Sequence, residues 1–209
     1  MKTQGKLQRI GARCGTDKAT LHRFCDTYEH LLNKYVSRVW EIGVLDGASL
    51  RMWAEYYPKA TITGFDWKDK SELELPKNAQ VCMLDQGSLP QLVSLSRKES
   101  GIDIIVDDGS HTISHQIQTF ETLFDCLKSG GQYIIEDLHT STPIHHGFGF
   151  RDGRGTLQYL NDIIQYRVPN GYPGQVQTEK VIANIEQIVL IANCDTDNRR
   201  SITSIITHK

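Results

Sequence analysis

The chain has 209 residues, which fits a single globular domain (residues 1–209) with one substantial core. Its formal net charge is −2, its composition is ordinary, and its apolar runs stay well short of the roughly 20 residues that cross a bilayer, so neither nucleic acid nor a membrane is expected as a partner. The five cysteines form no CxxC pair and the basic N-terminus leads into no apolar stretch, which favours free thiols and a cytoplasmic location.

The first 38 residues are predicted to form a helical cap, with a loop at residues 15–18 and a helix over residues 20–34. Strands and helices then alternate. We expect strands at residues 39–44, 60–65, 80–84, 103–106 and 132–135, and intervening helices at 49–57, 89–97 and 113–127. The helix over 113–127 has the clearest apolar stripe, which continues through Phe124 and Leu127.

After a long loop, a helix is expected over residues 157–166, followed by two apolar runs at 185–192 and 202–206. The polar joint at residues 193–198 is short, so these runs most simply form an antiparallel hairpin. The predicted fold is therefore α/β: an open, mostly parallel seven-stranded sheet with a C-terminal antiparallel hairpin and helices on both faces.

The loop after the first strand carries two glycines, Gly43 and Gly47, before a helix that includes Ser49. These glycines let the backbone approach a ligand, and the helix start offers unpaired N–H groups. The spacing is GxxxG rather than GxGxxG, which disfavours a pyrophosphate ligand. The preceding acidic residue, Glu41, suits a cofactor with an ammonium group, such as S-adenosylmethionine.

The ends of the next two strands predict an adenosine site. Asp66 lies 23 residues after Gly43, where a carboxylate can hold a ribose diol. Trp67 is placed to stack on an adenine, and Asp85 and Gln86 suit its amine and ring nitrogens. The alternative is that the glycines only shape a tight turn and Asp66 caps a helix.

Four carboxylates and a histidine follow two buried strands: Asp107, Asp108 and His111 after one, and Glu136 and Asp137 after the other. If the two strands are neighbours, one pocket receives them all, and so many like charges require a cation. Hard oxygen ligands favour Mg²⁺ or Mn²⁺.

In this interpretation Asp108, Glu136 and Asp137 bind the ion, a vicinal diol occupies its open positions, and His111 accepts a hydroxyl proton. Asp107 is expected to point away from Asp108 and to serve the cofactor or the loop. The alternative is structural: acidic residues at strand ends often cap the following helix, and a lone histidine in a loop is often a hydrogen-bonded structural residue.

Residues 139–156 are predicted to form an acceptor loop, in which His145, His146, Phe148 and Phe150 make a wall or lid; a solvated loop is an equal alternative.

Several motifs together resemble the macrocin and mycinamicin type of sugar O-methyltransferases. These are Gly-Thr-Asp-Lys at 15–18, Glu-Ile-Gly at 41–43, Gly-Ala-Ser-Leu at 47–50, Gly-Phe-Asp at 64–66, Asp-Gln at 85–86, Asp-Asp-Gly-Ser-His at 107–111 and Ile-Glu-Asp-Leu at 135–138. The likeness spans residues 15–141. It implies a Rossmann-like methyltransferase using S-adenosylmethionine and Mg²⁺, with Asp108, Glu136 and Asp137 as metal ligands and His111 as general base.

A weaker likeness to methyltransferase modules in glycan-building proteins of large DNA viruses favours a deoxyhexose acceptor such as rhamnose. It also implies attachment to glycosyltransferase domains; a homo-oligomer is the other expected assembly. The sequence leaves two rival functions open, a metal-dependent hydrolase and a non-catalytic module that binds S-adenosylmethionine.

Overall fold

The computed structural model describes residues 4–143, 146–194 and 200–209. The α-helices are α1 (Lys6–Cys14), α2 (Asp17–Thr20), α3 (Phe24–Leu31), α4 (Ala48–Tyr56), α5 (Leu89–Lys98), α6 (Ile113–Leu123), α7 (Thr156–Ile164) and α8 (Thr178–Asn184). The strands are β1 (Arg38–Ile42), β2 (Thr61–Asp66), β3 (Ala79–Met83), β4 (Ile102–Asp107), β5 (Leu127–Ile135), β6 (Ile185–Cys194) and β7 (Arg200–His208). Short 3₁₀ helices cover Phe124–Cys126, Leu138–Ser141 and His146–Phe148.

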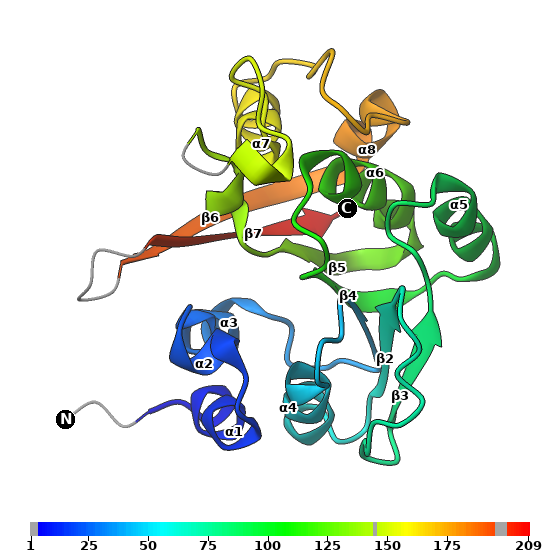
Figure 1. Ribbon diagram of the computed structural model, residues 1–209, viewed down its shortest axis with the longest axis vertical. Coiled ribbons are helices and arrows are strands. Elements are labelled where there is room, and N and C mark those ends of the chain that lie inside the picture. The colour runs from blue at the N-terminus through cyan, green and yellow to red at the C-terminus, as the bar shows by residue number, and fades with distance from the viewer. Residues whose placement is uncertain (1–3, 144–145, 195–199) are drawn as a thin grey trace.

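The seven strands form one sheet in the order β3-β2-β1-β4-β5-β7-β6 (Figure 1). Strands β1 to β5 pair in parallel with one another, whereas β7 pairs antiparallel with both β5 and β6. This confirms the predicted fold class. The chain reverses its direction of travel across the sheet between β1 and β4, the position where open α/β sheets form a ligand crevice.

Helices cover both faces of the sheet, because the parallel strands alternate apolar side chains between two cores. Val39 packs in the core below α1, α3 and α4, and its neighbour Trp40 packs in the core with α5, α6 and α7. The same alternation places Ile104 and Ile105 of β4 in opposite cores. Figure 1 shows α1 to α4 gathered on one side and α5 to α8 on the other.

Two predicted helices have different bounds in the structure. The helix expected over residues 20–34 is shortened to α3, because Arg23 adopts a left-handed conformation with φ of 56° and α3 starts only after it; the loop expected at residues 15–18 instead contains the start of α2. The helix expected to reach Leu127 ends at Leu123 and continues as one 3₁₀ turn. Leu127 instead begins β5 and pairs with Ile102. Pairing with β4 therefore outweighs the helical spacing of the apolar residues at this position.

Helix α8 was not predicted from the sequence. The C-terminal hairpin is present, with Val189 of β6 opposite Ile205 of β7, while residues 195–198 of its predicted joint lie outside the described residues. Cys14, Cys25, Cys82 and Cys126 are free thiols. Within the described ranges, every helix is too short or too polar to span a bilayer.

Candidate active site

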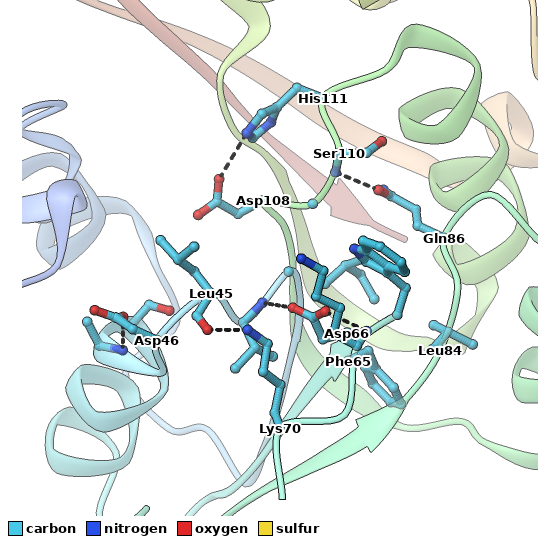
Figure 2. A pocket seen from close by; sticks show the side chains of 18 of the residues that line it. Leu45, Asp46, Phe65, Asp66, Lys70, Leu84, Gln86, Asp108, Ser110 and His111 are labelled. Atoms are coloured by element: carbon cyan, nitrogen blue, oxygen red, sulfur yellow. Dashed lines mark hydrogen bonds and ion pairs between the residues drawn. The ribbon is translucent and has the colours of Figure 1, made fainter. Parts of the chain in front are cut away.

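A cavity of about 700 Å³ opens at the carboxyl ends of the parallel strands (Figure 2). Residues after β1, β2, β3, β4 and β5 all contribute to its wall, and a loop of the N-terminal region closes one side. The predicted residues in its lining are Gly43, Ser49, Asp66, Trp67, Asp85, Gln86, Asp108, His111 and Asp137. Glu41, Gly47, Asp107 and Glu136 lie behind that lining.

Gly43 lets the β1 loop lie directly against the β4 loop. Its φ is +90°, and a Cβ at this position would stand 2.1 Å from the backbone oxygen of Asp108. Any other residue would push the β1 loop away from the β4 loop, which carries Asp108 and His111. Gly47, with φ of +77°, precedes the first residue of α4 and shapes that turn.

Asp66 and Trp67 form the wall expected for an adenosine. One carboxylate oxygen of Asp66 accepts the N–H of Val44 at 3.1 Å and the other accepts the N–H of Lys68 at 2.9 Å, so the side chain is held at the cavity edge (Figure 2). Each oxygen keeps a further lone pair for a ligand hydroxyl. The Trp67 side chain is 66% exposed, with the ammonium of Lys68 4.8 Å from its ring centroid.

Asp85, Gln86 and Asp107 mainly organise loops. Asp85 accepts the N–H of Gly87 at 2.8 Å. The amide of Gln86 donates to Asp107 at 2.7 Å and accepts the N–H of Ser110 at 2.9 Å, which fixes the loop after β4. Asp107 is buried next to the cavity rather than in its lining, and burial raises its pKa to about 7.

Glu41 is fully buried beneath the β1 loop and does not line the cavity. It accepts the hydroxyl of Ser49 at 2.8 Å and lies 3.3 Å from the ammonium of Lys18. Burial raises the pKa of Glu41 to about 7. In this structure Glu41 therefore faces a lysine of the chain rather than the cavity.

Asp108, His111 and Asp137 converge from the loops after β4 and β5. Their ligand atoms lie within 4.8 Å of one another, a separation that suits one metal ion. Nε2 of His111 is 3.6 Å from Oδ2 of Asp137 and 4.0 Å from Oδ1 of Asp108. Both His111 and Asp137 have left-handed backbones, with φ of 56° and 54°, a strain common at functional sites.

This cluster fits a hard divalent cation. Two carboxylates supply oxygen ligands. Among the described residues, buried Nδ1 of His111 and Oδ1 of Asp137 have no hydrogen-bond partner, although Nδ1 of His22 and Nδ1 of His139 lie 3.5 Å and 3.8 Å from that oxygen. Of the three predicted ligands, the structure brings Asp108 and Asp137 together with His111.

Glu136, the third predicted ligand, faces the interior. One of its oxygens accepts the hydroxyl of Tyr28 at 2.9 Å and the other accepts the ammonium of Lys18 at 2.8 Å. Burial raises its pKa well above the usual value, although Lys18 opposes that shift. A metal ion can use Glu136 only if its carboxylate exchanges Lys18 for the ion.

Lys18 is the site residue that sequence reasoning missed. It comes from α2, its side chain is fully buried, and it contacts Asp108, Glu136 and Glu41. Burial alone would lower the pKa of Lys18, but the three carboxylates raise it well above its usual value. Local hydropathy does not distinguish Lys18 from a solvated lysine; the available signal was its place in the Gly-Thr-Asp-Lys motif.

No family model matches the sequence, but curated relatives do. The chain is 32% identical over 196 residues to the 8-demethyl-8-alpha-L-rhamnosyl tetracenomycin-C 2'-O-methyltransferase of Streptomyces olivaceus, covering 86% of this chain and 51% of the relative. It is 37% identical over 181 residues to a tetracenomycin-C 3'-O-methyltransferase of the same organism, covering 78% of this chain and 46% of the relative.

The solved structure of the MycE methyltransferase from the mycinamycin biosynthetic pathway, in complex with Mg and S-adenosylhomocysteine (SAH), matches with a TM-score of 0.76. Its sequence identity is 29%, and the match covers 99% of this chain and 55% of that chain. The chain is a homologue of sugar O-methyltransferases. This confirms the resemblance to the macrocin and mycinamicin type, although the chain spans only about half the length of the curated relatives it matches.

The predicted acceptor loop of this sugar O-methyltransferase homologue begins beside the acidic cluster. The ring of Phe148 lies edge-on to His111, with centroids 6.2 Å apart, while Phe150 packs against the core that contains α6 and α7. His145 and the side chain of His146 lie outside the described part of the chain. Phe148 and His139, whose Nδ1 lies 3.8 Å from Oδ1 of Asp137, are thus described residues of this loop that reach the cluster.

Proposed function

We propose that the chain transfers a methyl group from S-adenosylmethionine to a hydroxyl of a sugar, with Mg²⁺ bound at the acidic cluster. The observation that carries this proposal is the shared cavity, in which the Asp66–Trp67 wall and the Asp108–His111–Asp137 cluster face the same space. Such a cavity would accommodate a nucleoside and a hard cation side by side.

The cofactors would supply two things: S-adenosylmethionine an electrophilic methyl group, and Mg²⁺ a positive charge that stabilises an alkoxide. Asp66 would hold the ribose diol and Trp67 would stack on the adenine. Asp108 and Asp137 would bind the ion; Glu136 stays a predicted third ligand. The conformation of the Gly43 loop would keep the two halves of the site in contact.

His111 is the proposed general base. Its Nε2 faces the space between Asp108 and Asp137, where a hydroxyl oxygen would sit, and would take the hydroxyl proton as the oxygen attacks the methyl carbon. The bond from that carbon to sulfur would break and S-adenosylhomocysteine would leave. The two carboxylates would then stabilise the imidazolium that forms. Alignment of the oxygen, the methyl carbon and the base accounts for the rest of the rate.

A deoxyhexose of the rhamnose type is the proposed acceptor. The support comes from two relatives whose names specify methylation of a rhamnosyl group on tetracenomycin C. Phe148 beside His111 offers an apolar surface for a sugar face, and residues 139–156 are the proposed acceptor loop. The chain is proposed to act in the cytoplasm, alone, as a homo-oligomer or attached to glycosyltransferase domains.

The proposal is tested by turnover and binding on the 209-residue chain. With S-adenosylmethionine, Mg²⁺ and a panel of rhamnosides, we expect a singly methylated product by mass spectrometry, with its position assigned by NMR. EDTA should abolish turnover and excess Mg²⁺ should restore it. Calorimetry should show binding of both SAH and the metal.

The same experiment separates the rival functions. A hydrolase would bind metal but not SAH, and a non-catalytic module would bind SAH without metal-dependent turnover. Turnover that persists unchanged in EDTA would refute the metal part of the proposal.

A further inference from the structure

The two oxygens of the Asp108 carboxylate face different partners. Oδ1 is directed to Nε2 of His111, 4.0 Å away, on the side of the acidic cluster (Figure 2). Oδ2 accepts a hydrogen bond from the ammonium of Lys18, which lines the same cavity. Lys18 therefore holds one oxygen of the carboxylate while the other oxygen is directed to the cluster.

Lys18 is itself fixed in place. Its side chain is 1% exposed, and its Nζ lies 2.8 Å from Oε2 of Glu136 and 3.3 Å from Oε1 of Glu41. Burial of an ammonium is costly unless carboxylates compensate it, so the three acidic partners determine where Nζ sits. The neighbouring residue Ala19 packs in the core below the sheet, which anchors α2 against the same face.

We propose that Lys18 is a positioning residue for the divalent-cation site, holding Oδ2 of Asp108 so that Oδ1 is presented to the ion. This inference rests on the proposed function only in that the acidic cluster binds a divalent cation. Partners that orient metal ligands in this way change metal affinity by about 10- to 100-fold when removed. The sequence assigns Lys18 no role of this kind.

A competing explanation is that Lys18 only neutralises the buried Glu136 and that its contact with Asp108 is incidental. The two explanations predict opposite signs for metal binding. Removing a nearby ammonium by itself favours a cation, because a repulsive charge disappears. Weaker binding after its removal therefore reports lost orientation of Asp108.

The test is Mn²⁺ binding to the full chain, measured by electron paramagnetic resonance (EPR), without substrate or turnover. We expect Lys18→Met to weaken Mn²⁺ affinity about 10- to 100-fold and to alter the spectrum of the bound ion. Lys180→Met is the matched control: it also removes an ammonium from an aspartate, Asp125, but its side chain is 61% exposed and lies on α8, away from the cavity. It should leave affinity and spectrum unchanged.

A second pair of variants keeps the test valid if Lys18→Met by itself does not fold. Glu136→Gln is compared with Glu136→Gln/Lys18→Met, in which the buried ammonium is removed together with one of its buried carboxylate partners, so that less uncompensated charge is left than in Lys18→Met alone. The double variant should bind Mn²⁺ at least about 10-fold more weakly than Glu136→Gln alone.

Equal or tighter Mn²⁺ binding on loss of Lys18, in either background, overturns the positioning role while the metal site stands. Absence of Mn²⁺ binding in the unmodified chain overturns the metal part of the proposed function instead. Far-UV circular dichroism of each variant establishes that affinities are compared between folded proteins.

Discussion

His111 combines a strained backbone with a cluster position. Its φ of 56° places the ring across from Asp108 and Asp137, and Asp137 is strained in the same way. Left-handed conformations at residues other than glycine cost about 1–3 kcal/mol and persist only where the surroundings enforce them. Two such residues facing each other support a site shaped for chemistry rather than for stability.

Replacing His111 tests its role as base. His111→Ala should cut turnover by about 10²–10⁴-fold, because no group would accept the hydroxyl proton, and should leave SAH affinity nearly unchanged. Turnover and calorimetry are the measurements. The control is the exposed His30→Ala, which should behave as the unmodified chain. Full activity of His111→Ala would remove it from the mechanism.

At Gly43, the backbone of the β1 loop lies against the backbone of the β4 loop, which carries Asp108 and His111. Gly43→Ala must accommodate a Cβ 2.1 Å from the backbone oxygen of Asp108 at a φ of +90°, so we expect the free energy of unfolding to fall by about 3–5 kcal/mol. Urea denaturation measures this loss.

A matched control for Gly43 is available at Gly101. Its φ is also positive, at +73°, but a Cβ there would meet nothing within 4 Å. Gly101→Ala should cost only the backbone strain, about 1–2 kcal/mol. Similar losses for both variants would show that the contact with Asp108 is not the cause.

At the scale of elements, strand β4 carries a buried aspartate with a structural role, Asp103, near its start, and Asp107 and Asp108 of the candidate site follow at its end. Asp103 is buried, and its Oδ2 accepts the N–H groups of Ser37 and Arg38, both at 2.9 Å, while Lys128 pairs with Oδ1. Burial alone would raise the pKa of Asp103, but the partners, led by Lys128, outweigh it and lower the pKa. This acid joins β4 to the start of β1.

A carboxylate whose pKa is lower in the folded state stabilises the fold above its unfolded pKa of about 4, and that contribution fades as the pH falls through the folded pKa. Asp103→Asn should therefore lower the free energy of unfolding by about 2 kcal/mol at pH 7, with a smaller difference below pH 4. Urea denaturation across pH measures it. Exposed Asp26→Asn should show no such loss, and a difference that grows in acid would contradict the assignment.

Helices and strands could be predicted where the spacing of the apolar residues fits only one kind of secondary structure. The runs that became β1, β2, β4 and the hairpin are short, contain several β-branched residues and are bounded by polar or glycine residues, and long-range pairing reinforces that local preference. The extension of α6 to Leu127 was wrong, because a helical stripe and a strand start share the same apolar residues and only the partner Ile102 decides between them. Helix α8 is short, and its few buried residues, Thr178 and Val181, gave too little periodicity.

At the scale of the whole molecule, the two cores lie back to back across one sheet. Trp53 is buried in the core with α1 to α4, and Trp40 in the core with α5 to α7. Since every central strand contributes to both cores, loss of either should expose the other. We expect the 209 residues to unfold as one cooperative unit, as the prediction of a single domain requires.

This is measured with two variants that each report on one core. In urea, the fluorescence transitions of Trp40→Phe and Trp53→Phe should each coincide with their own far-UV circular dichroism transition. The exposed Trp67 contributes equally to both. Transitions that separate in either variant would contradict the single-domain prediction.

The sequence by itself determined the order of elements, the acidic strand ends and the cavity residues Asp66, Trp67, Asp108, His111 and Asp137, because strand alternation and strand ends are local properties. It could not determine which acids face the cavity. Glu41 was predicted to bind the cofactor and Glu136 to bind the metal ion. Both carboxylates instead face Lys18, which is 23 residues from Glu41 and 118 residues from Glu136 in the sequence. A buried charge takes its place from the partners that compensate it, and only the tertiary structure brings those partners together.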